Sequence, residues 1–143
     1  MLIFVVSGLI LLIDQLSKFS ICNNLTNTSS IPILKNVFHL TLVQNKGTCF
    51  GLFPHQTFFF ASISVLVVGL ILFFYGRLKT STLPLRVGLA LILGGALGNL
   101  IDRLRFGFVV DFLDFRIWPV FNFADVSICA GAGLLILQLA RRR

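Results

Sequence analysis

The chain has 143 residues, of which 57% are hydrophobic and only 12% are charged, and its mean hydropathy is +0.97. These values lie outside the usual range of soluble domains, so we expect an integral membrane protein with a single membrane-embedded domain over residues 1–143. The net charge of +7 does not indicate nucleic-acid binding, because the basic residues stand at the ends of apolar segments, as expected for contact with anionic membrane lipids.

Four apolar segments predict an all-α fold with four transmembrane helices, over residues 2–16, 57–76, 83–101 and 121–140. Each is close to the ~20 residues that an α-helix needs to cross the hydrocarbon core of a bilayer. Residues 2–16 lack the basic start and the cleavage site of a secretory signal peptide, so we interpret them as a retained span.

The 12 Lys and Arg residues divide equally between the two sides of this four-helix topology. They are denser on the side of the termini, which places both termini in the cytoplasm. On this orientation the acids lie toward the outer face of the membrane. An ionisable group is costly in hydrocarbon and marks a functional candidate. All five acids are aspartates, namely Asp14, Asp102, Asp111, Asp114 and Asp125.

The loop between the first two spans contains a predicted strand. Residues 37–43 alternate apolar and polar side chains of high β-propensity, and Asn45-Lys46-Gly47 tolerate the positive φ of a tight turn. A second strand over residues 48–53 would return alongside the first. We therefore expect a small extracytoplasmic β-hairpin or sheet.

The third loop has the pattern of an interfacial segment. Phe112, Phe115, Ile117 and Trp118 interleave with Asp and Arg residues, which is typical of a segment that lies at the membrane surface with aromatic anchors. Pro119 separates this segment from the fourth span.

Two aspartates near the fourth span form the strongest candidate catalytic pair. Asn122 is a candidate N-cap of that helix, and Asp125 lies in its first turn, where the helix dipole favours an anion. A capping motif without catalytic function also explains these two residues. Asp111 is flanked by Val110 and Phe112, which favour its neutral form, although alone it could be a solvated loop residue. One ionised and one neutral carboxylate suit acid–base hydrolysis, so Asp111 and Asp125 are interpreted as a dyad that shares a proton.

Polar residues also stand at the ends of the third span and of the first. Asn99, Asp102 and Arg103 share one helical face, and a polar face at this depth must meet protein, water or a polar substrate. The glycines that precede them permit close helix contact. Asp14 and Lys18 form an i, i+4 pair in the favourable order, for which we weigh a structural ion pair and direct chemistry equally.

Other chemistries find less support in the sequence. His39 and His55 lack an HExxH context and the three cysteines lack metal-ligand spacing, so we expect no metal, no cofactor and no disulfide framework. Serine catalysis through Ser17 and Lys18 is disfavoured, because adjacent helical residues point about 100° apart. Two non-enzymatic alternatives stay open: a small four-span proton-coupled transporter with Asp14 as the proton carrier, and a structural membrane scaffold.

Five blocks of residues resemble, in order and spacing, the lipoprotein signal peptidase family, also called signal peptidase II. The blocks are Asp14-Gln-Leu-Ser-Lys18, Asn45-Lys-Gly47 with Phe50-Gly51, Gly95-Ala-Leu-Gly98-Asn99-Leu-Ile-Asp102-Arg103, Val109-Val-Asp111-Phe and Phe121-Asn122-Phe-Ala124-Asp125. No block is decisive by itself, but the joint order is highly specific and covers nearly the whole chain.

The resemblance implies a four-span aspartic endopeptidase of the bacterial plasma (inner) membrane, with its active site near the outer face. Such an enzyme removes the signal peptide from diacylglyceryl-modified prolipoproteins by cutting before the lipidated cysteine. It needs no metal, is the target of the cyclic peptide antibiotic globomycin, and is expected here as a monomer. The family pattern places the catalytic aspartates at Asp111 and Asp125. It implies substrate-binding, site-ordering or supporting roles for Asn45, Asn99, Arg103, Asn122, Asp14, Lys18 and Asp102.

Three positions depart from the family pattern. Cys49 stands where a small Ala or Ser is commoner, and Val126 stands where Ser or Thr often follows the last aspartate. Neither change removes a catalytic group. Asp114 has no fixed counterpart, so we expect it to be solvated or structural, and dispensable for catalysis.

Overall fold

A computed structural model of the chain describes residues 1–26, 30–47 and 56–141. The predicted return strand over residues 48–53, and with it Cys49 and His55, lies outside these ranges. The described elements follow in the order α1 (Leu2–Asn24), β1 (Ser30–Leu34), β2 (Phe38–Asn45), α2 (Thr57–Phe73), α3 (Tyr75–Leu78), α4 (Leu83–Phe106), β3 (Val109–Asp114) and α5 (Phe123–Ala140).

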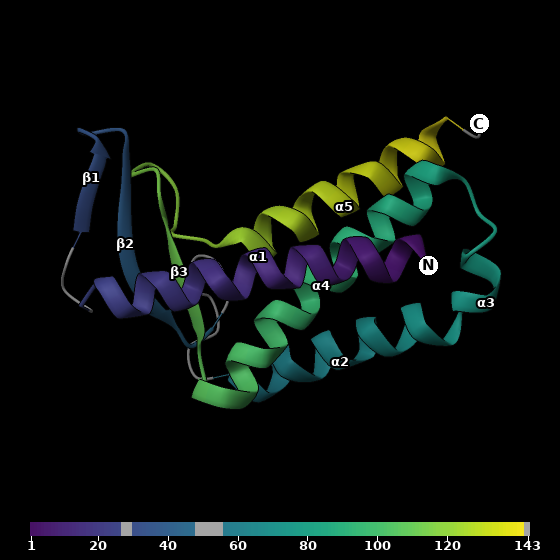
Figure 1. Ribbon diagram of the computed structural model, residues 1–143, viewed down its shortest axis with the longest axis horizontal. Coiled ribbons are helices and arrows are strands. Elements are labelled where there is room, and N and C mark those ends of the chain that lie inside the picture. Colours follow the sequence, from purple (N-terminus) through teal and green to yellow (C-terminus); the bar gives the residue numbers. More distant parts are fainter. Residues whose placement is uncertain (27–29, 48–55, 142–143) are drawn as a thin grey trace.

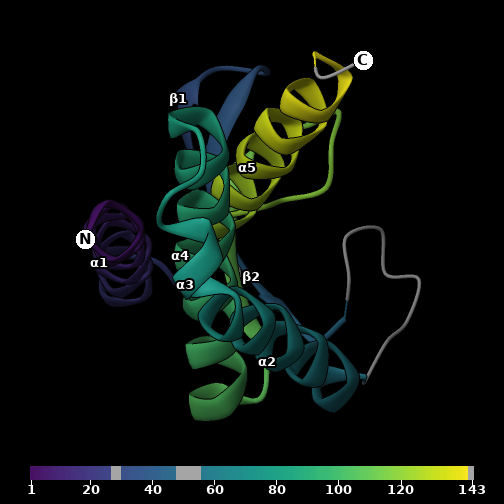
Figure 2. The ribbon, with the colours of Figure 1, turned by 90° about the vertical axis from the view of Figure 1, so that its right-hand side faces the viewer.

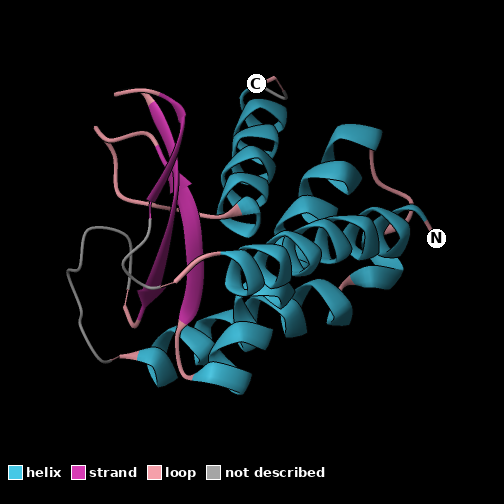
Figure 3. Cartoon of the chain, turned by 60° about the vertical axis from the view of Figure 1, so that its left-hand side comes forward, coloured by secondary structure: helices cyan, strands magenta, loops and turns pink. Residues whose placement is uncertain are grey.

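The long helices lie alongside one another, and the sheet stands at one end of them (Figure 1). Both termini lie at the opposite end. Helix α4 is central, because α1, α2 and α5 all pack against it (Figure 2). The strands stand together beside the helix ends, with β3 contacting both α1 and α4 (Figure 3). The end of the bundle near the sheet therefore brings together segments that are far apart in the sequence.

Three helices of the described chain are long and apolar enough to cross a membrane, namely α1, α4 and α5. Helix α2 is also apolar but has 17 residues, somewhat fewer than the ~20 that span a bilayer. The short α3 follows it after a single residue. The chain is therefore a mostly helical membrane protein with a small antiparallel sheet.

Two of the predicted spans end too early. Helix α1 continues past residue 16 to Asn24, and α4 continues past residue 101 to Phe106. Gly107 then ends α4 with a φ of 76°, a conformation that favours glycine. The predicted ends coincide with the charges of Asp14 and Asp102, which lower the local hydropathy. Both carboxylates are buried inside the bundle, so they interrupt the apolar pattern without interrupting the helix.

The sheet has three antiparallel strands in the order β1–β2–β3. Strand β2 covers most of the predicted strand over residues 37–43, but β1 and β3 are partners that the sequence did not predict. His39 lies opposite Asp114, whereas after a register shift Val43 lies opposite Asp111. The prediction of a small sheet is confirmed, and the predicted strand pairing is incomplete.

The first half of the third loop is a strand, which the prediction of an interfacial segment missed. Phe112 belongs to β3 and is only 2% exposed, so its predicted role as a membrane-surface anchor is wrong. Val, Phe and Leu around Asp111 suit a buried strand as well as a membrane surface. Phe115, Ile117 and Trp118 are exposed beyond the end of β3.

Glycines let α1 and α5 approach the central helix closely. A Cβ atom at Gly95 would lie 2.5 Å from the backbone oxygen of Ala124 in α5. A Cβ atom at Gly98 would collide with the carboxylate of Asp14 in α1, and one at Gly94 would also meet α1. The predicted close contact at these glycines is therefore confirmed.

The substitution Gly95→Ala should lower the free energy of unfolding by about 1–3 kcal/mol, because the added methyl group meets backbone that cannot move away. Thermal unfolding in detergent micelles would measure the loss. Gly133→Ala in α5 is the matched control, since nothing lies within 4 Å of its added Cβ. Equal stability of the two variants would contradict the close α4–α5 contact.

Candidate active site

Asn122 caps helix α5 and links the two aspartates of the predicted pair. Its Oδ1 accepts a hydrogen bond of 2.9 Å from the backbone N–H of Asp125, which confirms the predicted N-cap. Its Nδ2 donates a hydrogen bond of 2.6 Å to Oδ1 of Asp111. The side chain of Asn122 therefore both caps α5 and connects Asp111 to the start of that helix.

Asp111 lies in β3 and is 1% exposed. Asn45 at the end of β2 donates a hydrogen bond of 2.8 Å to its second oxygen, Oδ2. Burial raises the pKa of Asp111 to about 7, and the negative charge of Asp125 acts in the same direction. The hydrogen bonds from Asn45 and Asn122 partly offset this rise. Burial in β3 therefore favours the protonated form of Asp111.

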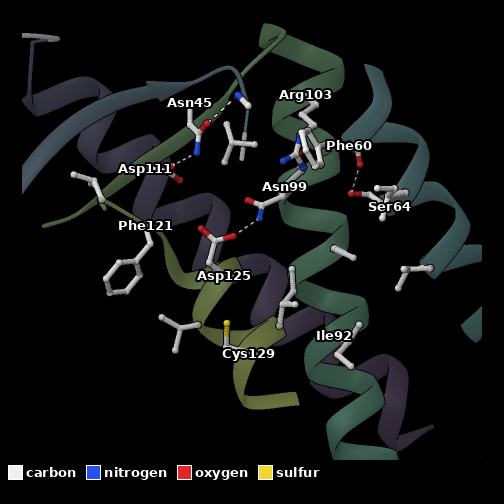
Figure 4. A pocket seen from close by; sticks show the side chains of 18 of the residues that line it. Asn45, Phe60, Ser64, Ile92, Asn99, Arg103, Asp111, Phe121, Asp125 and Cys129 are labelled. Atoms are coloured by element: carbon white, nitrogen blue, oxygen red, sulfur yellow. Dashed lines mark hydrogen bonds between the residues drawn. The ribbon is translucent and has the colours of Figure 1, made fainter. Parts of the chain in front are cut away.

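Asn99 holds the second aspartate from the central helix. Its Nδ2 donates a hydrogen bond of 2.7 Å to Oδ1 of Asp125 (Figure 4). Its Oδ1 accepts hydrogen bonds from Lys18 at 3.1 Å and from Asn122 at 3.2 Å. Three asparagines, from β2, α4 and the start of α5, thus surround the two carboxylates with amide donors.

Behind these amides lies a buried ion cluster. Nζ of Lys18 is 2.8 Å from Asp14 and 2.8 Å from Asp102, and all three side chains are at most 4% exposed. The structural ion pair between Asp14 and Lys18 is confirmed, and Asp102 joins it from α4. Gln15, to which we assigned no role, donates to both carboxylates at 3.2 and 3.0 Å. The position of Gln15 inside an apolar span could have identified it as a candidate site residue.

A cavity of about 750 Å³ opens between α2, α4, α5 and the sheet. Its polar end holds both aspartates of the predicted pair, while its remaining walls are mostly apolar (Figure 4). Arg103 also lines it, with its guanidinium 5.7 Å from the ring centre of Phe60 in α2. The cavity can therefore hold an apolar chain with a polar group placed at the carboxylates.

Of the two roles expected for Asp114, solvated or structural, the structure supports the structural one. Its side chain is 5% exposed and forms hydrogen bonds within the sheet. Thr41 donates to it at 2.9 Å, and the backbone N–H of Arg116 donates at 2.8 Å. Burial acts to raise the pKa of Asp114, but these bonds and the guanidinium of Arg116 lower it below its ordinary value. Asp114 is thus a structural residue of the sheet.

The structure brings together the residues to which the family pattern assigns catalytic, binding or supporting roles. Asn45, Asn99 and Asn122 contact the aspartate pair, Arg103 lines the same cavity, and Asp14, Lys18 and Asp102 form the cluster behind it. Within residues 1–26, 30–47 and 56–141, no group of three or more His, Cys, Asp or Glu side chains is arranged to hold a metal ion.

Fold and site together define a helical membrane protein with one buried and one partly buried carboxylate at the polar end of an apolar cavity. The family described as Signal peptidase (SPase) II matches residues 6–141, and the chain belongs to this family. The relatives named "Lipoprotein signal peptidase" from Halothermothrix orenii and Moorella thermoacetica are 49% and 54% identical to it. These matches cover 96% and 92% of this chain, and 94% and 87% of the two relatives.

The fold is also similar to that of a solved structure described as a bacterial membrane enzyme determined by the in meso method at 2.3 Å resolution. The TM-score is 0.90 at 29% sequence identity, over 97% of this chain and 87% of the other. The resemblance stated from the sequence is therefore confirmed. The chain is a bacterial membrane protein and a protease of the signal peptidase II family, with a role in signal-peptide processing.

The substitution Lys18→Met should lower the free energy of unfolding by about 3–5 kcal/mol, because it leaves two buried carboxylates without their cation. Adding Asp102→Asn should recover part of this loss, since it removes one of the uncompensated charges. Thermal unfolding in detergent would measure both effects. Lys35→Met, at an exposed position, is the control and should change stability by less than about 0.5 kcal/mol. A Lys18 variant as stable as this control would contradict the ion cluster.

Proposed function

We propose that the protein is an aspartic endopeptidase that removes the signal peptide from diacylglyceryl-modified prolipoproteins, by cleaving before the lipidated cysteine. The observation that carries the proposal is the position of Asp111 and Asp125 together at the polar end of an apolar cavity. A lipid-modified peptide combines a long apolar part with one polar amide to be cut, which suits such a cavity. Membership of the signal peptidase II family supports the same substrate class.

The two aspartates divide the chemistry between them. Asp125, at the amino end of α5, accepts a proton from a water molecule as the water oxygen attacks the scissile carbonyl carbon. Asp111 donates its proton to the carbonyl oxygen, and a tetrahedral intermediate forms without a covalent bond to the enzyme. When the intermediate collapses, the C–N bond breaks, the proton held by Asp125 passes to the leaving nitrogen, and Asp111 takes back a proton from the hydroxyl group that it had protonated. Asn45, Asn99 and Asn122 hold the pair, and Arg103 orders the substrate at the cavity wall.

In our proposal the chain crosses the bacterial plasma membrane four times, with α2 as the additional span. Both termini lie in the cytoplasm and the site lies near the outer face. The placement of both termini opposite the sheet supports an even number of spans (Figure 1). A monomer contains every residue of the proposed site, and compounds of the globomycin type would compete with the substrate there. A transporter with Asp14 as proton carrier is not favoured, because Asp14 is fixed by Lys18 and buried between helices.

Each of the substitutions Asp111→Asn and Asp125→Asn should lower the maturation rate of a lipidated prolipoprotein by about 10³-fold or more, because an amide cannot exchange the required proton. The assay follows conversion of the precursor to the mature form by gel shift in reconstituted membranes. Asp114→Asn is the control, since Asp114 pairs with Thr41 and Arg116 and does not line the cavity. Normal processing by either dyad variant, at normal membrane levels, would refute the mechanism.

Activity should fall as the pH rises through about 7, because Asp111 then loses the proton that it must donate. The hydrogen bond from Asn45 favours the ionised form of Asp111, so Asn45→Ala should raise its pKa and move the alkaline limb of the kcat/KM profile upward by about one pH unit. Thr41→Ala, in the same strand but bonded to Asp114, should leave the limb in place. A downward shift for Asn45→Ala would contradict the assignment of Asp111 as the acid.

A further inference from the structure

Lys18 reaches the proposed base through one intermediate side chain. Its Nζ lies 3.1 Å from Oδ1 of Asn99, and Nδ2 of Asn99 lies 2.7 Å from Oδ1 of Asp125. Lys18 belongs to α1, Asn99 to α4 and Asp125 to α5. Two hydrogen bonds in series therefore connect three helices and end on a carboxylate of the proposed dyad.

The ammonium group of Lys18 determines which atom of the Asn99 amide accepts and which donates in these two hydrogen bonds. Lysine can only donate hydrogen bonds, so the atom of Asn99 that meets it must be the amide oxygen. The NH₂ group of Asn99 then has to face Asp125. All three N–H groups of Lys18 have acceptors, on Asp14, Asp102 and Asn99, so the ammonium cannot turn away from Asn99 without weakening a buried ion pair.

Asn99 differs in this respect from Asn122. The amide of Asn122 is oriented by a backbone N–H, that of Asp125, which is itself fixed by helix α5. The oxygen of Asn99 receives side-chain donors instead, from Lys18 at 3.1 Å and from Asn122 at 3.2 Å. The Asn122 donor also serves Asp111 at 2.6 Å and the carbonyl of Val110 at 3.3 Å. Among the described residues, Lys18 is therefore the charged donor to the side-chain oxygen of Asn99.

We propose that Lys18 is a positioning residue for the hydrolysis, which orients the Asn99 amide so that its N–H, and not its carbonyl oxygen, meets Asp125. The inference rests on the proposed function, in which Asp125 accepts a proton from water. With the amide reversed, a carbonyl oxygen would face the ionised carboxylate, and a charge-assisted hydrogen bond would be replaced by repulsion. Lys18 thus prepares the base without contacting the reacting atoms.

A double-mutant cycle between Lys18→Met and Asn99→Leu tests this role. The cycle is measured in two backgrounds, the parent sequence and the Asp102→Asn variant. In the second background the loss of the Lys18 ammonium is matched by the loss of one carboxylate. kcat and KM for a lipidated prolipoprotein are corrected for the folded fraction. With Asn99 present, Lys18→Met should lower kcat about tenfold or more and leave KM unchanged. With Asn99→Leu present, Lys18→Met should cause no further loss.

A second measurement needs no turnover. Selective ¹⁵N-asparagine labelling in detergent micelles reports hydrogen exchange of the Asn99 side-chain NH₂. We expect exchange to be slow in the parent chain and faster with either Lys18→Met or Asp125→Asn. Exchange that stays slow with Lys18→Met would overturn the proposal.

Additive losses in the cycle would also overturn it, because Lys18 would then act by its charge or by stabilising the bundle. The separate variant Asp125→Asn distinguishes failure of the positioning role from failure of the proposed function. If Asp125→Asn processes the precursor normally, the aspartic mechanism fails. If it abolishes processing while the Lys18 and Asn99 losses are additive, only the positioning role fails.

Discussion

The buried ion cluster of Lys18 is the interaction on which both the bundle and the site depend. It joins Asp14 of α1 to Asp102 of α4, and each carboxylate also accepts a backbone N–H from a further element. Asp14 accepts from Ala124 at 3.0 Å and Asp102 from Val110 at 3.1 Å. Three helices and strand β3 therefore meet at one cation. Inside a bilayer, water cannot solvate a charge that has lost its partner. Removing the cation of the cluster therefore leaves uncompensated buried charges and destabilises the fold.

Asn45, Asn99 and Asn122, which donate hydrogen bonds to the proposed dyad, are amides and not cations. A lysine or arginine against Asp111 or Asp125 would favour the ionised form of both carboxylates and oppose a shared proton. Asparagine side chains supply hydrogen bonds of defined direction without a full charge. The ammonium of Lys18 lies behind these asparagines and donates a hydrogen bond to Asn99. Asn45 and Asn122 thus position Asp111 and also limit the rise of its pKa.

The candidate site was more predictable than the fold around it. Acids are rare in an apolar chain, so the positions of Asp111 and Asp125, and the N-cap at Asn122, could be recognised from the sequence alone. Helix ends could not, because Asp14 and Asp102 look like span boundaries until their buried partners are known. Strand β3 was hidden because a short apolar run fits a buried strand and a membrane-surface segment equally well.

Strand pairing depends on contacts between distant segments, which local patterns do not contain. β1 and β3 flank β2 from opposite directions in the sequence, and neither has an alternation strong enough to identify its partner. The burial of Asp114 follows from the same pairing, since Thr41 and Arg116 reach it only once β2 and β3 are adjacent. The spacing of polar residues in the sequence thus predicted the members of the candidate site. It did not predict the strand pairing that holds them in place.

The register shift within β2 has a consequence for how this chain can change during evolution. Side chains of a strand alternate between faces, so one extra residue before Val43 reverses which residues of β2 share a face with Asp111. Asn45 is on that face because of the shift. Loss or gain of a single residue between His39 and Asn45 would turn Asn45 away, although no residue of the dyad is altered. We therefore expect this segment to tolerate substitutions far better than insertions or deletions.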